Sequence, residues 1–381
     1  MSTRGAAPAA AYNAAPSHAG HSMTHDSALS ALLSALPAWP GGPSLGDSGA
    51  QVRVEPGGGQ ARVEVATAMP VETHAAALEG AMRTTLQARG LALTSLRLRV
   101  RIPAHAVQPG LSPLANVRNI IAVGSGKGGV GKSTTAVNLA LALAQGGARV
   151  GVLDADIYGP SIPLMLGVSA RPESPDGKTI EPVRAHGVEA MSIGLLVDTD
   201  TPMIWRGPMA TSALGTLLND THWGGDEGLD VLVVDLPPGT GDIQLTLAQK
   251  IPVAGAVIVT TPQDVATLDA TKALKMFEKV NVPVLGLIEN MAMHACTQCG
   301  HVEHVFGSGG GARMAHAAGV PLLASLPLDV RVREQADAGV PIVVAEPDGA
   351  AARAYREAAL ALAMALAGRP RAASGIDVSL V

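Results

Sequence analysis

The stretch that decides the fold is Gly126-Lys127-Gly128-Gly129-Val130-Gly131-Lys132-Ser133, which matches G-x-x-x-x-G-K-S/T. An apolar run at residues 120–123 precedes it, and helical spacing begins at Thr134. Glycines let the backbone turn so that several N–H groups point at one anion, at the positive end of a helix dipole. The sequence therefore predicts a phosphate loop, with Lys132 at the β- and γ-phosphates of a nucleotide and the Ser133 hydroxyl at Mg²⁺.

The pattern after this loop predicts an α/β domain over residues 117–368. Apolar runs at 150–153, 231–234, 256–259 and 284–288 alternate with helical stretches. Runs that are apolar on both faces are typical of parallel strands covered by helices on two sides. We therefore expect a doubly wound, mostly parallel sheet.

A smaller α+β domain is predicted before it, at residues 26–102. Valines alternate on either side of Gly57-Gly58-Gly59, which predicts a hairpin, and helical stretches are expected at 26–36 and about 72–89. Leucines alternate with arginines over 96–100, which predicts a further strand. Three prolines make residues 103–116 a linker.

The two ends of the chain are predicted to be tails. Residues 1–25 are rich in Ala, Ser, Pro and His without periodicity, which indicates disorder, and residues 369–381 form a short C-terminal tail.

Composition excludes several classes of protein. The 381 residues carry a net charge of −5 and only 2% aromatics, so the chain lacks the basic surface and stacking platforms of a general nucleic-acid binder. No apolar run reaches the ~18 residues that cross a bilayer. With two cysteines, a disulfide-built secreted fold is excluded. We expect a cytoplasmic protein without a nucleic-acid or membrane partner.

Lys127 is a second lysine inside the loop, which ordinary phosphate loops do not require. The segment resembles the deviant Walker A loop of the SIMIBI-type P-loop NTPases that include septum-site, plasmid-partition and arsenite-pump ATPases and the nitrogenase iron protein. In that family this lysine reaches across a dimer to the partner's nucleotide. The resemblance therefore implies an ATP-binding homodimer, with the nucleotide held by residues Gly126, Lys127, Gly128, Gly129, Val130, Gly131, Lys132, Ser133 and Thr134.

Carboxylates follow where the family places them, at the carboxyl ends of neighbouring strands. By resemblance, Asp156 orients or activates the attacking water and would join Lys127 and Lys132 as a catalytic residue. Asp235 ends a Walker B strand and would hold Mg²⁺, and residues 237–242 resemble the second switch loop. Asn290 is a candidate for the adenine edge. For each aspartate alone, a helix N-cap is the structural alternative.

The cysteines, Cys296 and Cys299, form a single C-x-x-C. Together with Asp-Ala-Asp-Ile-Tyr-Gly-Pro at 154–160, the glycine run at 307–311 and Leu-Pro-Leu-Asp at 326–329, they resemble the Mrp/ApbC family of iron–sulfur cluster carriers over residues 117–345. The chain departs from that family at Thr297, where proline is usual, and in a small domain without cysteine.

The resemblance implies a [4Fe–4S] cluster that is delivered to apo iron–sulfur proteins. Such a cluster normally takes four cysteines, and a symmetric dimer supplies two from each chain. The sequence thus predicts a slowly ATP-hydrolysing homodimer that carries a labile cluster between its subunits.

Several alternatives remain open at this point. His294, His301 and His304 flank the cysteines, so that two of them could complete a Cys₂His₂ zinc site within one chain. A thioredoxin-type redox pair, an electron-transferring reductase and an ATP-dependent positioning switch of the partition type are the others.

Overall fold

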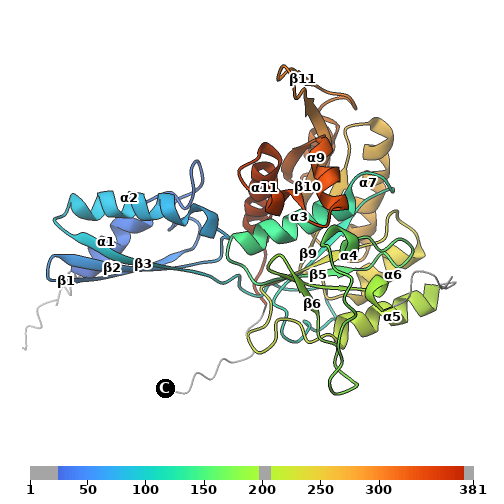
Figure 1. Cartoon of the computed structure of the whole chain (residues 1–381), viewed down its shortest axis with the longest axis horizontal. Helices are drawn as coiled ribbons and strands as arrows, with labels where there is room; N and C mark the ends of the chain where they lie inside the picture. Colours follow the sequence, from blue (N-terminus) through green and yellow to red (C-terminus); the bar gives the residue numbers. More distant parts are fainter. Residues whose placement is uncertain (1–24, 197–206, 373–381) are drawn as a thin grey trace, which may run out of the picture.

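The computed structural model describes residues 25–196 and 207–372, which form two lobes, each built on a sheet of its own (Figure 1). The predicted N-terminal tail lies outside the described residues apart from His25, and residues 373–381 of the predicted C-terminal tail lie outside them as well. No helix in the described ranges is long and apolar enough to cross a membrane.

The small lobe contains the predicted hairpin, helices and strand. Its elements are α1 (His25–Ser34), β1 (Gln51–Gly57), β2 (Gln60–Thr67), the 3₁₀ turn η1 (Glu72–His74), α2 (Ala75–Gln87) and β3 (Ala92–Val100). The strand β3 begins four residues before the predicted run, since Ala92–Ser95 lacks the leucine–arginine alternation but still pairs with β2. Val54, Val63 and Leu96 share the face of the sheet that packs against α1 and α2.

The large lobe is a nine-stranded sheet. Its strands are β4 (Ile120–Gly124), β5 (Val150–Asp154), β6 (Val183–Ala185), β7 (Val188–Ser192), β8 (Val231–Asp235), β9 (Gly255–Thr260), β10 (Val284–Ala295), β11 (Val302–Glu303) and β12 (Leu322–Pro327). The spatial order is β11-β10-β9-β4-β8-β5-β7-β6, with β12 beside β10. All pairs are parallel except β6 with β7 and β11 with β10.

Helices cover both faces of this sheet, which confirms the predicted doubly wound α/β class. One hydrophobic cluster packs α3 (Lys132–Gln145), α4 (Ile162–Met165), α10 (Ile342–Ala345) and α11 (Ala350–Ala367) on one face. A second cluster packs α5 (Gly207–Asn219), α6 (Asp242–Lys250), α7 (Asp264–Lys279) and α8 (Gly310–Ala318) on the other. The remaining elements are the turn η2 (Ile193–Leu195) and α9 (Val330–Asp337).

The strand β10 differs most from the prediction, because it ends at Ala295 and not at residue 288. The polar pair Glu289 and Asn290 interrupts the apolar run, and Met291 takes a left-handed φ of +56°, but the strand resumes and pairs with β12 at Met293 and then with β11. The strand therefore extends out of the sheet up to the cysteine pair.

A small hydrophobic contact joins the two lobes. Met69 and Val71, which follow β2, are buried against Leu360 and Ala363 of α11. The N–H of Glu72 also donates to the carbonyl of Gly146, at the end of α3, over 3.1 Å. The small lobe therefore contacts two helices of the large one.

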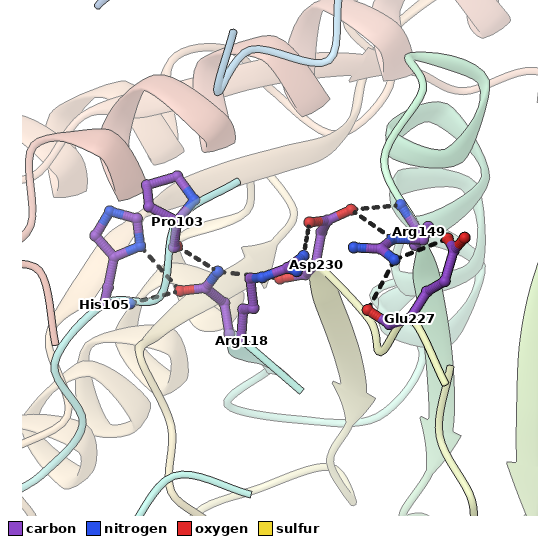
Figure 2. Close-up of polar contacts among 7 residues, drawn as sticks. Pro103, His105, Arg118, Arg149, Glu227 and Asp230 are labelled. Atoms are coloured by element: carbon purple, nitrogen blue, oxygen red, sulfur yellow. Dashed lines mark hydrogen bonds and ion pairs between the residues drawn. The ribbon is translucent and has the colours of Figure 1, made fainter. Parts of the chain in front are cut away.

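Hydrogen bonds and ion pairs hold the linker beside the residues that directly precede strands β4, β5 and β8 of the large sheet (Figure 2). The Oδ1 atom of Asn119 accepts hydrogen bonds from the backbone N–H of His105 over 3.0 Å and contacts His105 Nδ1 at 2.9 Å. The Asn119 amide donates to the carbonyls of Pro103 and Asp230. The buried carboxylate of Asp230 pairs with Arg118 and Arg149. These contacts hold the linker at the end of the sheet opposite the phosphate loop.

Candidate nucleotide and metal-binding site

The predicted phosphate loop joins β4 to α3, at the carboxyl end of the central strands. Gly129 and Gly131 have φ angles of +83° and +80°, which favour glycine, so the loop needs its glycines for its shape. Gly126 is required for another reason, because a Cβ there would lie 2.1 Å from the carbonyl carbon of Asp269 in α7. Ser133 and Thr134 follow in the first turn of α3.

Lys132 and Asp235 form a buried ion pair behind this loop. The Lys132 ammonium lies 2.6 Å from Asp235 Oδ1 and donates to the Ser133 hydroxyl over 3.1 Å. The Lys132 side chain is 5% exposed and that of Asp235 is fully buried. Burial raises the pKa of Asp235, while the charge of Lys132 opposes that rise. The sequence predicts that Lys132 binds phosphate. In this structure its ammonium pairs with the Walker B carboxylate of Asp235.

The Mg²⁺ ligands predicted from the sequence fit the donor set seen here. Asp235 Oδ2 is buried and has no hydrogen-bond partner in the described structure, although Oδ1 of the same group is paired. The Ser133 hydroxyl lies beside it, joined through Lys132. Carboxylate and hydroxyl oxygens are the ligands that Mg²⁺ prefers.

Asp154 and Asp156 follow β5 at the same edge of the sheet. Asp154 is fully buried and accepts four hydrogen bonds, from the backbone N–H groups of Asp156, Ser161 and Ile162 and from the Ser192 hydroxyl. Burial, reinforced by the nearby charge of Asp235, raises the pKa of Asp154 to about 7.

The predicted catalytic residue Asp156 is half-buried. Burial raises its pKa and the charge of Lys132 opposes the rise. Sequence reasoning assigned no role to Asp154. The sequence feature that could have identified Asp154 is its position at the end of β5, two residues before Asp156. Its four hydrogen bonds hold the backbone that carries Asp156.

The predicted second switch loop lies against the residue that precedes the phosphate loop. The N–H of Gly239 donates to the Ser125 carbonyl over 3.0 Å, and just before the switch loop the N–H of Leu236 donates to the Val123 carbonyl of β4 over 3.0 Å. These contacts place the two loops side by side.

Lys127 is half-buried at the rim of the phosphate loop. Its carbonyl accepts a hydrogen bond from the Ser125 hydroxyl, which fixes its backbone. Its ammonium has no hydrogen bond or ion pair with any residue that the structure describes. An ammonium at this rim can pair with a group from beyond the described residues.

Asn290 lies against the phosphate loop, where its side-chain amide donates to the Val130 carbonyl over 2.9 Å. A Cβ on Gly131 would come within 2.3 Å of the same Asn290 nitrogen, so loop and strand approach closely. Contact with the adenine edge stays a prediction. The structure gives Asn290 a second role, which is to tie β10 to the loop.

The cysteine pair lies in the turn between β10 and β11. The N–H of Cys296 donates to the carbonyl of His301 over 2.8 Å, and the N–H of Gly300 donates to the carbonyl of Cys296 over 2.9 Å. Cys296 is half-buried, Cys299 is exposed, and both thiols are free. Backbone N–H groups of Cys299 and Gln298 lower the pKa of the Cys296 thiol. This turn therefore favours a thiolate, the form that binds metal.

The flanking histidines do not complete a metal site in this conformation. Nδ1 of His294 lies 3.0 Å from the carbonyl of Leu328, and Nδ1 of His304 lies 2.7 Å from the carbonyl of Ala292. Across residues 25–196 and 207–372, no three His, Cys, Asp or Glu side chains gather closely enough to hold a metal ion. The one-chain Cys₂His₂ zinc site stays an alternative, because an imidazole whose Nδ1 meets a carbonyl can still ligate a metal through Nε2.

A glycine loop between β4 and α3, with a lysine and a Walker B aspartate behind it, defines a P-loop NTPase. This one carries two thiols at its sheet edge. The model of the NUBPL iron-transfer P-loop NTPases, within the ParA group, matches residues 116–363. The chain belongs to this family, which confirms the resemblance to the Mrp/ApbC carriers.

Curated relatives and a solved structure are similar to this chain over the same domain. An iron–sulfur cluster carrier protein of Pseudomonas fragi is 58% identical over 71% of this chain and 94% of its own length. The iron–sulfur cluster transfer protein NUBPL of Mus musculus is 49% identical over 65% of this chain and 77% of its own. A nucleotide-binding protein of Archaeoglobus fulgidus, solved with ADP, is 37% identical with a TM-score of 0.52, over 59% of this chain and 87% of that one.

Proposed function

We propose that this protein is an ATP-binding carrier of a labile [4Fe–4S] cluster, which two copies of the chain hold between them and deliver to apo iron–sulfur proteins. The observation that carries the proposal is the pair of free thiols at the edge of a P-loop NTPase. In the reducing cytoplasm such thiols stay available as ligands. The named cargo of the relatives supports the same reading.

The number of ligands argues for a shared cluster. A [4Fe–4S] cluster takes four thiolates, and the described part of each chain offers Cys296 and Cys299 without a third ligand nearby. A two-fold axis through the cysteine turn supplies the other two. A cluster held at an exposed edge by two subunits leaves when they separate, which a carrier requires.

Residues in and behind the phosphate loop would bind ATP and hydrolyse it. Lys132 would leave Asp235 for the β- and γ-phosphates, and Asp156 would orient the attacking water. Ser133 and Asp235 would hold Mg²⁺, which supplies charge neutralisation for the departing phosphate. Lys127, which has no partner among the described residues, would reach the nucleotide of the second copy.

A single strand connects the two sites. Asn290 contacts the phosphate loop, and Cys296 follows six residues later, directly after β10 ends at Ala295. A shift of the loop on nucleotide binding would therefore act on the cysteine turn through β10. We expect nucleotide occupancy to change cluster retention in this way.

Anaerobic reconstitution with iron and sulfide, followed by metal analysis and sizing, tests the proposal. Four irons per two chains in a dimer are expected for the unmodified protein. Cys299→Ala should lose the cluster and keep ATP binding, whereas Thr297→Ala, which changes the same turn without removing a thiol, should keep both. One zinc per monomeric chain, or full iron content in Cys299→Ala, would refute the shared cluster.

A further inference from the structure

The three-stranded sheet of the small lobe has one face that no helix of the described residues covers. Its other face packs on α1 and α2, and Figure 1 shows the lobe projecting from the large sheet, with α2 lying along it. The uncovered face collects five of the lobe's seven arginines, and the lobe has no lysine. These exposed arginines are Arg53 on β1, Arg62 on β2, Arg97 and Arg99 on β3, and Arg101 directly after it.

Most of these charges are unpaired. Arg97 reaches Glu64 on the neighbouring strand at 3.7 Å, with the arginine side chain 64% exposed. In the described residues the other four arginines make no ion pair or side-chain hydrogen bond. Three of them in a row, at positions 97, 99 and 101, repel one another along a single strand. A face of this kind gains most when carboxylates from outside come between the guanidinium groups.

The geometry selects one kind of partner. In an extended strand, alternate side chains on one face lie about 6.7 Å apart. The strand β3 ends the order β1-β2-β3, so within residues 25–196 and 207–372 one of its edges has no neighbouring strand. An extended segment added along that edge would place its own alternate side chains opposite the arginines. Acidic residues at every second position match this repeat.

Nucleic acid fits less well. Glu55 and Glu64 lie among the arginines on the same face and would repel phosphates, and the face carries no aromatic residue on which a base could stack. Guanidinium groups also match carboxylates with two parallel hydrogen bonds.

We propose that β3 is a docking strand for an extended polypeptide segment with acidic residues at alternate positions. If the carrier function proposed above holds, the protein that presents this segment is an acceptor apo-protein. Binding of the acidic segment itself does not depend on that function. The interaction weakens as ionic strength rises, because the face is exposed.

Fluorescence anisotropy with the full chain tests this. The probe is a labelled ten-residue peptide of alternating Glu and Thr, compared with the Gln–Thr analogue and with a peptide of the same composition in two blocks. We expect the alternating acidic peptide to bind roughly tenfold more tightly than either. Equal binding of the blocked peptide, or tighter binding of a DNA duplex, would overturn the proposal.

Two pairs of variants distinguish peptide binding by this face from a general effect of the lobe's positive charge. Arg97→Gln with Arg99→Gln should weaken peptide binding roughly tenfold. Arg83→Gln with Arg89→Gln removes the same charge from the α2 side of the lobe and should leave binding within about twofold. Equal loss in both pairs would show that the peptide responds only to the overall charge of the lobe, which would overturn the proposal. Iron content and ATP binding of each variant report on the carrier function separately.

Discussion

The side-chain amide of Asn290 in β10 donates to the backbone carbonyl of Val130 in the phosphate loop over 2.9 Å. This contact joins the strand that leads to the cysteines with the loop that leads to α3. Both groups are buried, so losing the donor leaves the carbonyl unsatisfied.

Asn290→Ala should therefore loosen the phosphate loop. We expect ATP affinity to fall about tenfold, equivalent to about 1.4 kcal/mol, in calorimetric titration. Asn219→Ala, which removes an exposed amide on α5, is the control and should leave affinity unchanged. Unchanged affinity in Asn290→Ala would show that the loop does not depend on this contact.

The pair Lys132 and Asp235 should behave as a coupled unit in the nucleotide-free protein. Lys132→Met strands a buried carboxylate and should lower the free energy of unfolding by about 3 kcal/mol in urea titration. Adding Asp235→Asn should restore most of that loss.

The control for this cycle is an exposed pair. Lys272→Met breaks the pair with Asp269 at 2.9 Å and should cost under about 1 kcal/mol. Additive losses from Lys132→Met and Asp235→Asn would contradict the coupling.

Asp154 should make stability depend on pH. Its pKa rises from 3.8 to about 7 in the folded chain, because burial disfavours the charged form. Between about pH 4 and 7, unfolding releases this proton, so the free energy of unfolding falls as pH rises. The total loss is about 4 kcal/mol, and above pH 7 the contribution is constant.

Asp154→Asn should remove this slope, whatever its constant cost in lost hydrogen bonds. Urea unfolding of both proteins from pH 4 to 8 gives the difference. Asp176→Asn is the control. N–H groups of Thr179 and Lys178 lower the pKa of Asp176 to about 2, so this carboxyl titrates below pH 4 and its replacement should leave the slope from pH 4 to 8 unchanged. Parallel pH curves for the unmodified protein and Asp154→Asn would disprove the assignment.

Cys296 should react as a thiolate below the usual pH range of a thiol. In Cys299→Ala it is the sole thiol, and backbone N–H groups of residue 299 and Gln298 still lower its pKa. Iodoacetamide alkylation, followed by mass spectrometry, should reach half its maximal rate at a lower pH than a free cysteine peptide does. A midpoint equal to that of the peptide would remove the case for a preformed ligand turn.

The sequence alone determined the class of fold, the phosphate loop and the cysteine pair. These depend on local signals: glycine spacing around Lys132, apolar runs that fill a parallel strand, and two cysteines three residues apart. Each signal is contained within a few neighbouring residues, so no knowledge of distant contacts was required.

The tertiary structure decided what those residues touch. Asp235 lies 103 positions after Lys132, Asn290 lies 160 after Val130, and the full length of β10 depends on pairing with β11 and β12. The uncovered arginine face also emerged only when three strands were set in register. Such partners come together through packing of the whole sheet, so they could not be predicted from the spacing of residues along the chain.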